Sequence, residues 1–197
     1  MERIREIAEA ARGVAARMSA ATREQKDRTL QAMADRLKAR GPDIIAANRA
    51  DLDAAGSAGI APQVVKRLRF DQTKLDGRIR SLNKIAALPD PVGSVIEQQQ
   101  LDNGLHASRV RVPLGVILMI YEARPHVSIN AGAFCLKSGN AAILKGGSEA
   151  QRCNRLLGEL WQDSLADAGL PREALRMISG SHEEINALLQ QEDCIDL

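Results

Sequence analysis

Aromatic residues are scarce in this chain of 197 amino acids. Phenylalanine, tyrosine and tryptophan make up only 2% of the sequence, although 45% of its residues are hydrophobic. Alanine and leucine must therefore supply most of the core, which indicates helix-rich layers. The length corresponds to one large domain or two small ones, with enough apolar residues for a sizeable core.

Cysteine and histidine are also few, with three residues of each type. An odd number of cysteines without regular spacing argues against a disulfide framework. No cysteine and histidine pair has the spacing of zinc ligands, so we expect no metal site. Cys135 lies in an apolar helix pattern and is expected to be a buried structural thiol. Cys153 lies in the first turns of a helix, whose dipole could lower its pKa, and Cys194 lies in the last apolar run.

Neither sign of charge dominates the chain, and long apolar runs are missing. Lysine and arginine total 27 against 25 aspartate and glutamate residues, a net charge of +2. This balance gives no electrostatic case for nucleic-acid binding. The longest apolar run, residues 112–121, is too short to cross a bilayer. The first residues also lack the basic and then apolar order of a signal peptide. We expect a cytoplasmic protein whose partners are neither nucleic acids nor membranes.

The first 90 residues show the periodicity of amphipathic helices. Apolar residues recur at three- and four-residue spacing between Ile4 and Met18. Thr22 and Gln25 have the spacing of a capping box, which predicts the start of a second helix. A glycine–proline pair then predicts a helix boundary, and the many charged residues are expected on solvated faces. Helices are expected over about 4–18, 23–40, 43–55 and 72–87.

A break rich in proline, residues 88–93, separates these helices from a predicted β-hairpin. The expected strands are 94–101 and 105–112, and the turn between them, 102–104, reads Asp-Asn-Gly. Asn-Gly tolerates the positive φ angles that tight hairpin turns need. Neither face of the second strand is cleanly apolar. The hairpin is therefore expected to pack against another part of the protein or another subunit.

From residue 113 the chain alternates between short apolar runs and helical patterns. This β-α-β-α-β-α-β order predicts an open parallel sheet with right-handed crossovers. The first run, residues 114–121, is continuous enough to indicate a strand buried on both faces. The predicted fold class is α/β, with a Rossmann-like sheet behind a helical amino-terminal part. The expected strands are 114–121, 140–145, 173–180 and 194–197, the chain ending within the last.

One strand-to-helix corner, Lys145-Gly-Gly-Ser-Glu149, has the composition of an anion site. The carboxyl ends of parallel strands form the ligand crevice of such a sheet. Gly146 and Gly147 would let backbone N–H groups approach a ligand, and Lys145 would add a positive charge. Ser148 is expected to cap the next helix, whose first N–H groups attract anions. The order matches neither a Walker loop nor Gly-x-Gly-x-x-Gly, so nucleotide binding and a structural glycine corner both stay open.

A second corner follows the strand that ends near Tyr121. Arg124 could hold a carboxylate or phosphate through two parallel hydrogen bonds. The alternative is an ordinary surface pair between Glu122 and Arg124. His126 is expected to be a helix-start residue rather than a general base.

The longest distinctive stretch contains both corners. Residues 111–150 read RVPLGVILMIYEARPHVSINAGAFCLKSGNAAILKGGSEA. This stretch closely resembles the gamma-glutamyl phosphate reductase family, the proline-pathway branch of the aldehyde dehydrogenase superfamily. The upstream Asp-Pro-Val-Gly, the Asn-Gly-Leu turn and the closing Cys-Ile-Asp-Leu also match, so the resemblance covers essentially the whole chain. It divides the chain into a helical segment, 1–90, a hairpin, 91–112, and an incomplete nucleotide-binding region, 113–197.

The resemblance implies an NADP-dependent oxidoreductase, a glutamate-5-semialdehyde dehydrogenase. Such an enzyme uses NADPH to reduce L-glutamyl 5-phosphate to L-glutamate 5-semialdehyde, with release of phosphate, through a thioester on a cysteine. A full-length homo-oligomer joined by the hairpin strands is implied as well. Lys145 would lie at the adenosine ribose, beside the 2′-phosphate of NADP(H), and Arg124 would meet an acidic group of the substrate. The implied cofactor-binding residues are Lys145, Gly146, Gly147, Ser148, Glu149, Gly180 and Ser181. The implied substrate-side residues are Tyr121, Glu122 and Arg124.

Two departures from the family pattern qualify what the resemblance implies. His126 stands where the family has asparagine, which affects local contacts only. The resemblance also places the nucleophilic cysteine in a second, catalytic domain beyond residue 197, and none of the three cysteines lies in its motif. We therefore expect the amino-terminal half of a reductase, which alone should not turn over. The alternatives are a truncated, non-catalytic NADP-binding module and an interaction fragment without a ligand.

Overall fold

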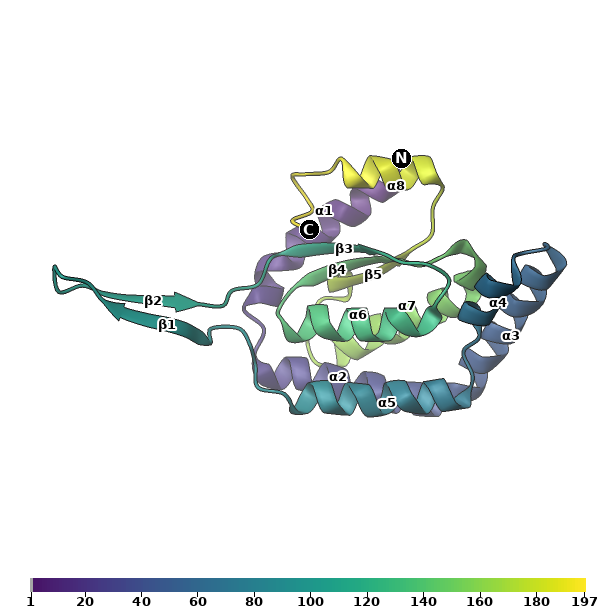
Figure 1. Cartoon of the computed structure of the whole chain (residues 1–197), viewed down its shortest axis with the longest axis horizontal. Helices are drawn as coiled ribbons and strands as arrows, with labels where there is room; N and C mark the ends of the chain where they lie inside the picture. Colours follow the sequence, from purple (N-terminus) through teal and green to yellow (C-terminus); the bar gives the residue numbers. More distant parts are fainter. Residues whose placement is uncertain (1) are drawn as a thin grey trace.

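The structure, a computed structural model, describes residues 2–197, apart from the side chains of residues 2, 3 and 182. Helices build the amino-terminal part of the chain, as the apolar periodicity predicts (Figure 1). The pattern does not predict α4, because its 7 residues are too few to show a helical period. The helices are α1 (Glu2–Ser19), α2 (Arg23–Ala39), α3 (Gly41–Ser57), α4 (Pro62–Leu68) and α5 (Gln72–Ala87).

Local sequence signals set where these helices begin. The Thr22 hydroxyl accepts a hydrogen bond from the Gln25 N–H at 3.2 Å. The Gln25 side chain accepts one from the Thr22 N–H at 3.1 Å, so the predicted capping box forms. Asp71 caps α5 by accepting a hydrogen bond from the Lys74 N–H at 3.0 Å. Pro42 lies in the first turn of α3, where its missing N–H costs no hydrogen bond.

The predicted hairpin is present and projects from the body of the molecule (Figure 1). Its strands, β1 (Val95–Gln100) and β2 (His106–Val110), pair antiparallel, and every residue in them is exposed. Gly104 takes the positive φ that the turn needs, 84°. Asn103 does not have a positive φ, and its side chain accepts a hydrogen bond from the Leu105 N–H. Because the Leu101 N–H donates to the Leu105 carbonyl at 2.8 Å, the turn itself has three residues, 102–104.

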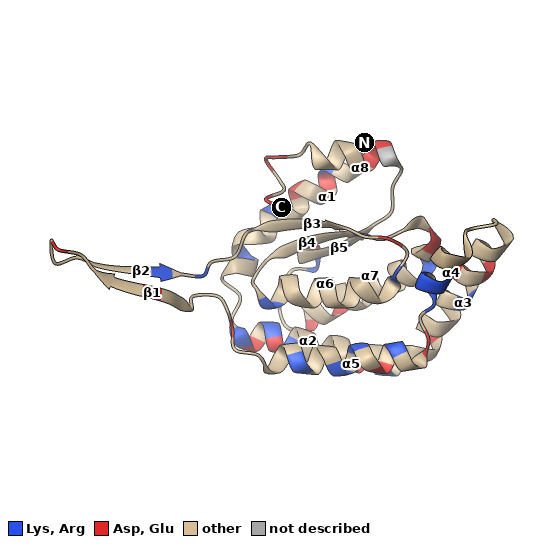
Figure 2. Ribbon diagram, in the orientation of Figure 1, with Lys and Arg blue, Asp and Glu red and all other residues tan. Residues whose placement is uncertain are grey.

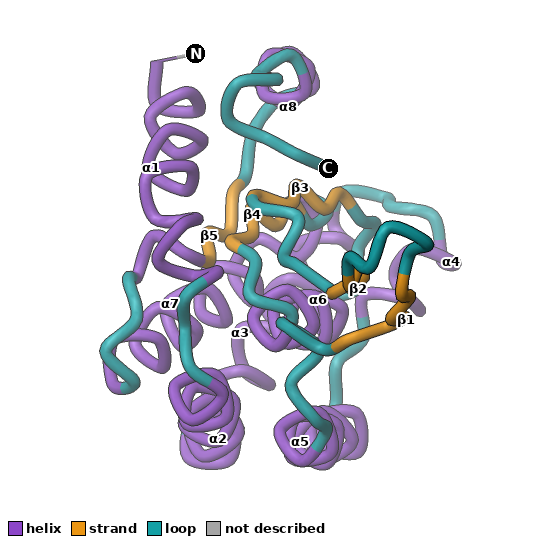
Figure 3. Tube along the Cα trace, turned by 90° about the vertical axis from the view of Figure 1, so that its left-hand side faces the viewer, coloured by secondary structure: helices purple, strands orange, loops and turns teal. Residues whose placement is uncertain are grey.

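A parallel sheet with strand order β3-β4-β5 forms the centre of the remaining chain. Figure 3 shows α6 and α7 on one face of this sheet, α1 and α8 on the other, and α2 and α5 as an outer layer. The predicted α/β fold is therefore confirmed. The elements are β3 (Val116–Ile120), α6 (Pro125–Lys137), β4 (Ala141–Lys145), α7 (Gln151–Asp167), β5 (Leu175–Ile178) and α8 (His182–Leu189). Short 3₁₀ turns, η1 (Ser148–Ala150) and η2 (Arg172–Ala174), precede α7 and β5.

Two strand predictions are corrected at the edge of this sheet. β3 is mostly half-buried rather than covered on both faces, because it is the outer strand. Residues 194–197 form no regular strand, although the Asp196 N–H donates to the Val116 carbonyl at 2.9 Å and the Leu118 N–H donates to the Leu197 carbonyl at 2.7 Å. The Asp196 carboxylate accepts the Val116 N–H at 2.8 Å. A side chain thus takes a donor that a backbone carbonyl would use, which interrupts the ladder.

One large hydrophobic core joins the amino-terminal helices to the sheet. Trp161 of α7 is fully buried in it, together with Leu30 and Met33 of α2 and Ile143 of β4. The helical segment therefore packs directly on the α/β region. Within residues 2–197, no helix is long and apolar enough to cross a membrane.

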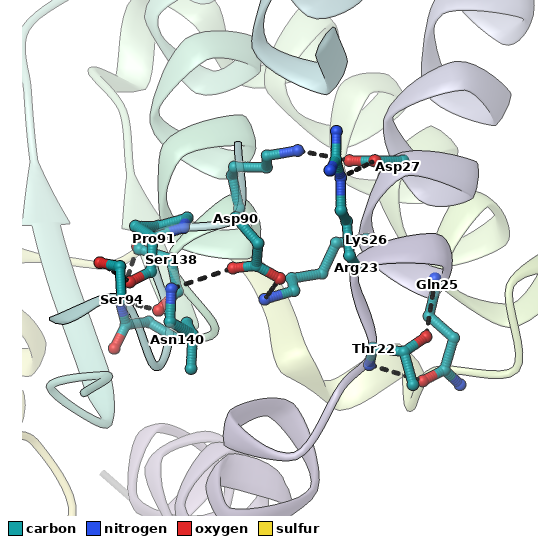
Figure 4. A network of polar contacts seen from close by, with 12 residues as sticks. Thr22, Arg23, Gln25, Lys26, Asp27, Asp90, Pro91, Ser94, Ser138 and Asn140 are labelled. Atoms are coloured by element: carbon teal, nitrogen blue, oxygen red, sulfur yellow. Dashed lines mark hydrogen bonds and ion pairs between the residues drawn. The ribbon is translucent and has the colours of Figure 1, made fainter. Parts of the chain in front are cut away.

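Charged residues of both signs lie along α2, and mainly basic ones along α5, as expected for solvated faces (Figure 2). Two lysines are nevertheless buried, Lys26 of α2 and Lys137 of α6. Lys26 pairs with Asp90 at 2.6 Å (Figure 4). Lys137 pairs with Asp27 at 2.5 Å. Asp90 lies just before the hairpin, so the first pair ties one leg of the hairpin to α2. On the other leg, Asn140 accepts hydrogen bonds from two backbone N–H groups at 2.7 and 2.9 Å. Both legs of the hairpin are therefore held at the body.

Candidate functional site

A cleft of about 230 Å³ opens at the carboxyl ends of β4 and β5, between α7 and α8. We call it the sheet-edge cleft. One wall is the Gly146–Ser148 corner, and the others carry Arg155 of α7 and Arg176 of β5. Ile4 and Ile7 of α1 line it as well. Parallel sheets place ligand crevices at this edge, so the cleft lies where the strand order predicts.

The predicted cofactor corner contributes to the cleft, but unevenly. Gly146, Gly147 and Ser148 line it, whereas Lys145, the last residue of β4, does not. A Cβ on Gly147 would lie 3.0 Å from the Ala123 backbone nitrogen, and one on Gly146 would lie 3.1 Å from the side-chain carboxamide carbon of Asn154. Both glycines are therefore required for close packing within the chain. The structural and the ligand-binding interpretations of these glycines are thus compatible.

The prediction that Ser148 caps the next helix is wrong. Ser148 begins η1, and α7 starts after it without a side-chain cap from its own segment. Asp51 of α3 supplies the cap instead. One carboxylate oxygen accepts the Arg152 N–H at 3.2 Å, and the other accepts the Cys153 N–H at 2.9 Å. Asp51 is only 1% exposed. The anion site at the start of α7 is therefore filled by a carboxylate of the chain itself.

The three thiols are buried. Burial raises the pKa of Cys135 to about 11, as expected for a structural thiol. Burial, together with the nearby negative charge of Asp51, raises the pKa of Cys153 to about 12. The possible lowering of this pKa by the helix dipole is thus overturned, because desolvation dominates and Asp51 offsets the dipole. Cys194 lies in the irregular final segment rather than in a strand.

A short chain of hydrogen bonds connects the end of β3 to the cleft. The Tyr121 hydroxyl and the Ser128 hydroxyl are 2.6 Å apart, and Ser128 donates to the Asn154 side-chain oxygen at 3.3 Å. Asn154 lines the cleft beside Gly146. Burial raises the pKa of Tyr121 to about 12, so its hydroxyl keeps its proton. Tyr121 therefore supports the Gly146–Ser148 corner from within.

The second corner holds its charged residues apart. Glu122 forms an ion pair with Arg67 of α4, not with Arg124, so the predicted surface pair has a different arginine. Arg124 is exposed and directly precedes α6, and its N–H donates to the Glu122 carbonyl at 2.7 Å. His126 lies in the first turn of α6, as expected. Burial and neighbouring cations lower the pKa of His126 to about 4, so it is neutral at pH 7.

The turn between β5 and α8, which contains the predicted Gly180 and Ser181, closes the cleft on this side. Ser181 caps α8, and the Glu184 carboxylate accepts a hydrogen bond from the Ser181 N–H at 2.8 Å, which completes a capping box. A Cβ on Gly180 would lie 3.0 Å from a carboxylate oxygen of Glu184. The cleft itself is lined here by Ser179 and Glu184, next to the predicted Gly180 and Ser181.

Sequence reasoning misses four residues of this site: Asp51, Asn154, Arg155 and Arg176. Arg155 could have been found from its spacing, because it follows Gln151 by four residues and therefore lies on the same face of α7, next to the glycine corner. Both residues line the cleft. Asp51 has no such signal, because its partners lie about a hundred residues away in the chain.

The chain belongs to the aldehyde dehydrogenase family, because the model of that family matches residues 1–197. A more particular similarity is to gamma-glutamyl phosphate reductases. The enzyme of that name from Sorangium cellulosum (strain So ce56) is 44% identical over 191 residues, which are 94% of this chain and 45% of that protein. The crystal structure of the Thermotoga maritima gamma-glutamyl phosphate reductase has a TM-score of 0.92 and 30% identity, over 98% of this chain and 47% of that one.

A more distant neighbour shares the fold alone. It is glyceraldehyde-3-phosphate dehydrogenase from Methanocaldococcus jannaschii, complexed with NADP. Its TM-score is 0.71 at 15% identity, and the match covers 98% of this chain and 40% of that one. This chain spans about half the length of the curated relatives that it matches.

Proposed function

We propose that this chain supplies the nucleotide-binding region of an NADPH-dependent gamma-glutamyl phosphate reductase. The proposed enzyme reduces L-glutamyl 5-phosphate to L-glutamate 5-semialdehyde and releases phosphate, a step of proline biosynthesis. The observation that carries the proposal is the sheet-edge cleft, where a glycine corner and two arginines meet at the ends of two parallel strands. The name shared by the relatives supports this choice of reaction.

The residues of the cleft fit a phosphate-bearing dinucleotide. Its Gly146–Gly147 wall has no side chains to block the approach of a ligand to the backbone, and the two arginines supply positive charge. When bound, the dinucleotide supplies the hydride. We assign the adenosine ribose to the first corner, Lys145 to Glu149, with Gly180 and Ser181 completing the site. The role of these residues is to bind and orient the cofactor.

The substrate side is assigned to the corner of Tyr121, Glu122 and Arg124. Glu122 is paired with Arg67, whereas Arg124 is exposed and directly precedes a helix. A guanidinium in this position suits an acidic group of glutamyl phosphate, because it can donate two parallel hydrogen bonds. This assignment places substrate and cofactor at neighbouring corners of the same sheet edge.

We also propose that the hairpin joins subunits of a homo-oligomer. Val95, Ile96 and Val110 are each about half exposed on it, although they are apolar. The outer edges of its two strands have no further strand beside them within the described residues. Such edges pair readily with other strands. Replacing residues 95–110 by a short Gly-Ser linker should leave the thermal transition of the body intact and abolish assembly, measured by light scattering.

The cofactor proposal is tested by titrating the purified chain with NADPH and following thermal unfolding. A ligand that binds only the folded state at about 100 times its Kd should stabilise it by roughly 2.7 kcal/mol. An interaction fragment without a ligand would show no shift with millimolar NADPH, and that result would refute the cofactor assignment.

The reaction is tested separately by offering glutamyl phosphate and NADPH to the same chain. Because Cys135, Cys153 and Cys194 are buried, we expect binding of NADPH without turnover. Oxidation of NADPH that depends on glutamyl phosphate would show that one of these thiols reaches the substrate after all.

A further inference from the structure

We infer that Arg155 and Arg176, rather than Lys145, select NADPH over NADH by binding the adenosine 2′-phosphate. The inference rests on the proposed function, since it requires that the dinucleotide enters the sheet-edge cleft. It differs from the assignment that the family resemblance implies, in which Lys145 lies beside this phosphate. Three groups near the corner could hold a phosphate: the start of α7, the ammonium of Lys145, and the two guanidiniums.

The start of α7 is unsuited to a second anion. Its N–H groups at Arg152 and Cys153 already donate to the carboxylate of Asp51. Asp51 is buried and also pairs with the Arg152 guanidinium at 3.3 Å, so the N–H groups and the arginine at this helix end are already engaged. A phosphate in this region must therefore be held by side chains rather than by the helix terminus.

Lys145 is at the wrong place for selecting a group inside the cleft. It is the last residue of β4, the central strand, and lies between Ile120 of β3 and Ile178 of β5. It is half-buried there and does not line the cleft. Its ammonium is therefore suited to the ribose at the edge of the cleft, and not to a phosphate held between the cleft-lining side chains.

The two arginines face the same space from different elements. Gly158 lets α7 approach β5 closely, since a Cβ there would lie 2.7 Å from the Met177 Cγ. Arg155 is one turn before Gly158, and Arg176 adjoins Met177, so this close approach brings both arginines to the cleft. Among the described side chains, which leave out those of residues 2, 3 and 182, no ion pair or side-chain hydrogen bond engages either guanidinium. Two cations lining one cleft without acceptors form a matched site for a dianionic phosphate.

The acidic residues of the cleft leave this positive charge in place. Glu184 is engaged as the capping-box partner of the Ser181 N–H. Glu159 lies one turn beyond Arg155 on α7 and lines the cleft, but no ion pair joins the two. One carboxylate thus remains against two guanidiniums. A ligand without the 2′-phosphate would gain little from the arginines, which is the physical basis of the inferred selectivity.

The test measures equilibrium binding of NADPH and NADH to the 197-residue chain by isothermal titration calorimetry. The variants are Arg155→Ala, Arg176→Ala and the double substitution, with Lys145→Ala as the rival. We expect each arginine variant to bind NADPH about tenfold more weakly, the loss of one charge-assisted contact, while its affinity for NADH is unchanged. Arg155→Lys and Arg176→Lys should keep part of the preference, because they keep the charge but not the bidentate geometry.

Two controls separate this site from general electrostatics and from misfolding. Arg80→Ala removes the same charge from the exposed surface of α5 and should bind both dinucleotides like the wild-type chain. Adenosine 2′-monophosphate and adenosine 5′-monophosphate serve as small probes, and only the first should lose affinity in the arginine variants. Circular dichroism melts check that each variant is folded.

The outcomes distinguish the inference from the proposed function. If the wild-type chain binds neither dinucleotide, the proposed cofactor site and the inference both fail. If it binds NADPH more tightly than NADH, and Lys145→Ala removes this preference while the arginine variants keep it, the inference alone is overturned. If the wild-type chain binds both dinucleotides equally, the cofactor site stands and the selectivity does not.

Discussion

Basic side chains meet two contrasting surroundings in this molecule. Near the base of the hairpin, Lys26 and Lys137 are almost fully buried, and each is paired with a carboxylate. In the sheet-edge cleft, Arg155 and Arg176 face an open space, and the described part of the chain offers neither an ion-pair partner. A buried charge without a partner is costly, so the lysines serve the fold. A cation in an open cleft costs little, so the arginines are available to a ligand.

The largest effect that this comparison predicts is at Lys26. Burial acts to raise the pKa of Asp90, but Lys26 and the Val92 N–H bring this pKa below its ordinary value. Lys26→Met should lower the free energy of unfolding by about 3 kcal/mol, because it leaves the Asp90 carboxylate without its partner. Urea denaturation at pH 7 measures this change. Lys38→Met, on the exposed face of the same helix, is the matched control, and equal stability of the two variants would contradict the role given to Lys26.

The next effect in size is at Asp51, a buried acidic counterpart of the lysines. Asp51→Ala leaves two N–H groups of α7 without an acceptor and should cost about 2 kcal/mol, the upper range for the loss of a helix cap. Asp51→Asn should cost less, since an amide oxygen can still accept one hydrogen bond. Asp53→Ala, an exposed position on the same helix, should be neutral. If Asp51→Ala and Asp53→Ala have the same free energy of unfolding, the cap contributes nothing to stability.

The smallest predicted effect concerns His126, a titrating group among cations. Burial lowers its pKa to about 4, and the charges of Lys74, Arg78 and Arg124 act in the same direction. An unfolded histidine has a pKa of about 6.5, so between these two pKa values the unfolded state binds more protons than the folded state. The free energy of unfolding should therefore fall as the pH drops from 6.5 toward 4, on the order of 1 kcal/mol after allowance for solvent screening.

His126→Asn provides the check on this pH dependence. Asparagine does not titrate, so the variant should lose less stability than the wild-type chain when the pH is lowered from 7 to 5. The measurement is urea denaturation of both proteins at the two pH values. Parallel losses in the two proteins would place the pH dependence on other groups.

The parts of the fold that were predictable depend on neighbours in sequence. Thr22 and Gln25 are three residues apart, and their capping box forms as expected. The hairpin is also local, since its two strands are joined by a three-residue turn. The final segment was not predictable, because its backbone contacts depend on where Asp196 meets β3, 80 residues earlier in the chain. Its apolar run indicates burial but not a regular ladder.

The candidate site divides in the same way. The glycine corner was recognisable because Gly146 and Gly147 follow a buried strand directly. Its capping was not, since nothing in the local sequence shows that Asp51 of α3, rather than Ser148, binds the first N–H groups of α7. Arg176 could not be predicted as a site residue for a different reason. A single arginine in a short strand has no periodic pattern, and only the packing of α7 against β5 shows which space it faces.

The carboxylate of Asp51 also bears on protein engineering. The Lys145–Glu149 corner is not a self-contained unit, because a helix some 100 residues upstream completes it. A graft of β4 and α7 into another scaffold would carry the glycines, the serine and Arg155, yet it would expose two donors that this chain satisfies from elsewhere. Any transplant of the corner must therefore bring α3 along or supply an equivalent acceptor.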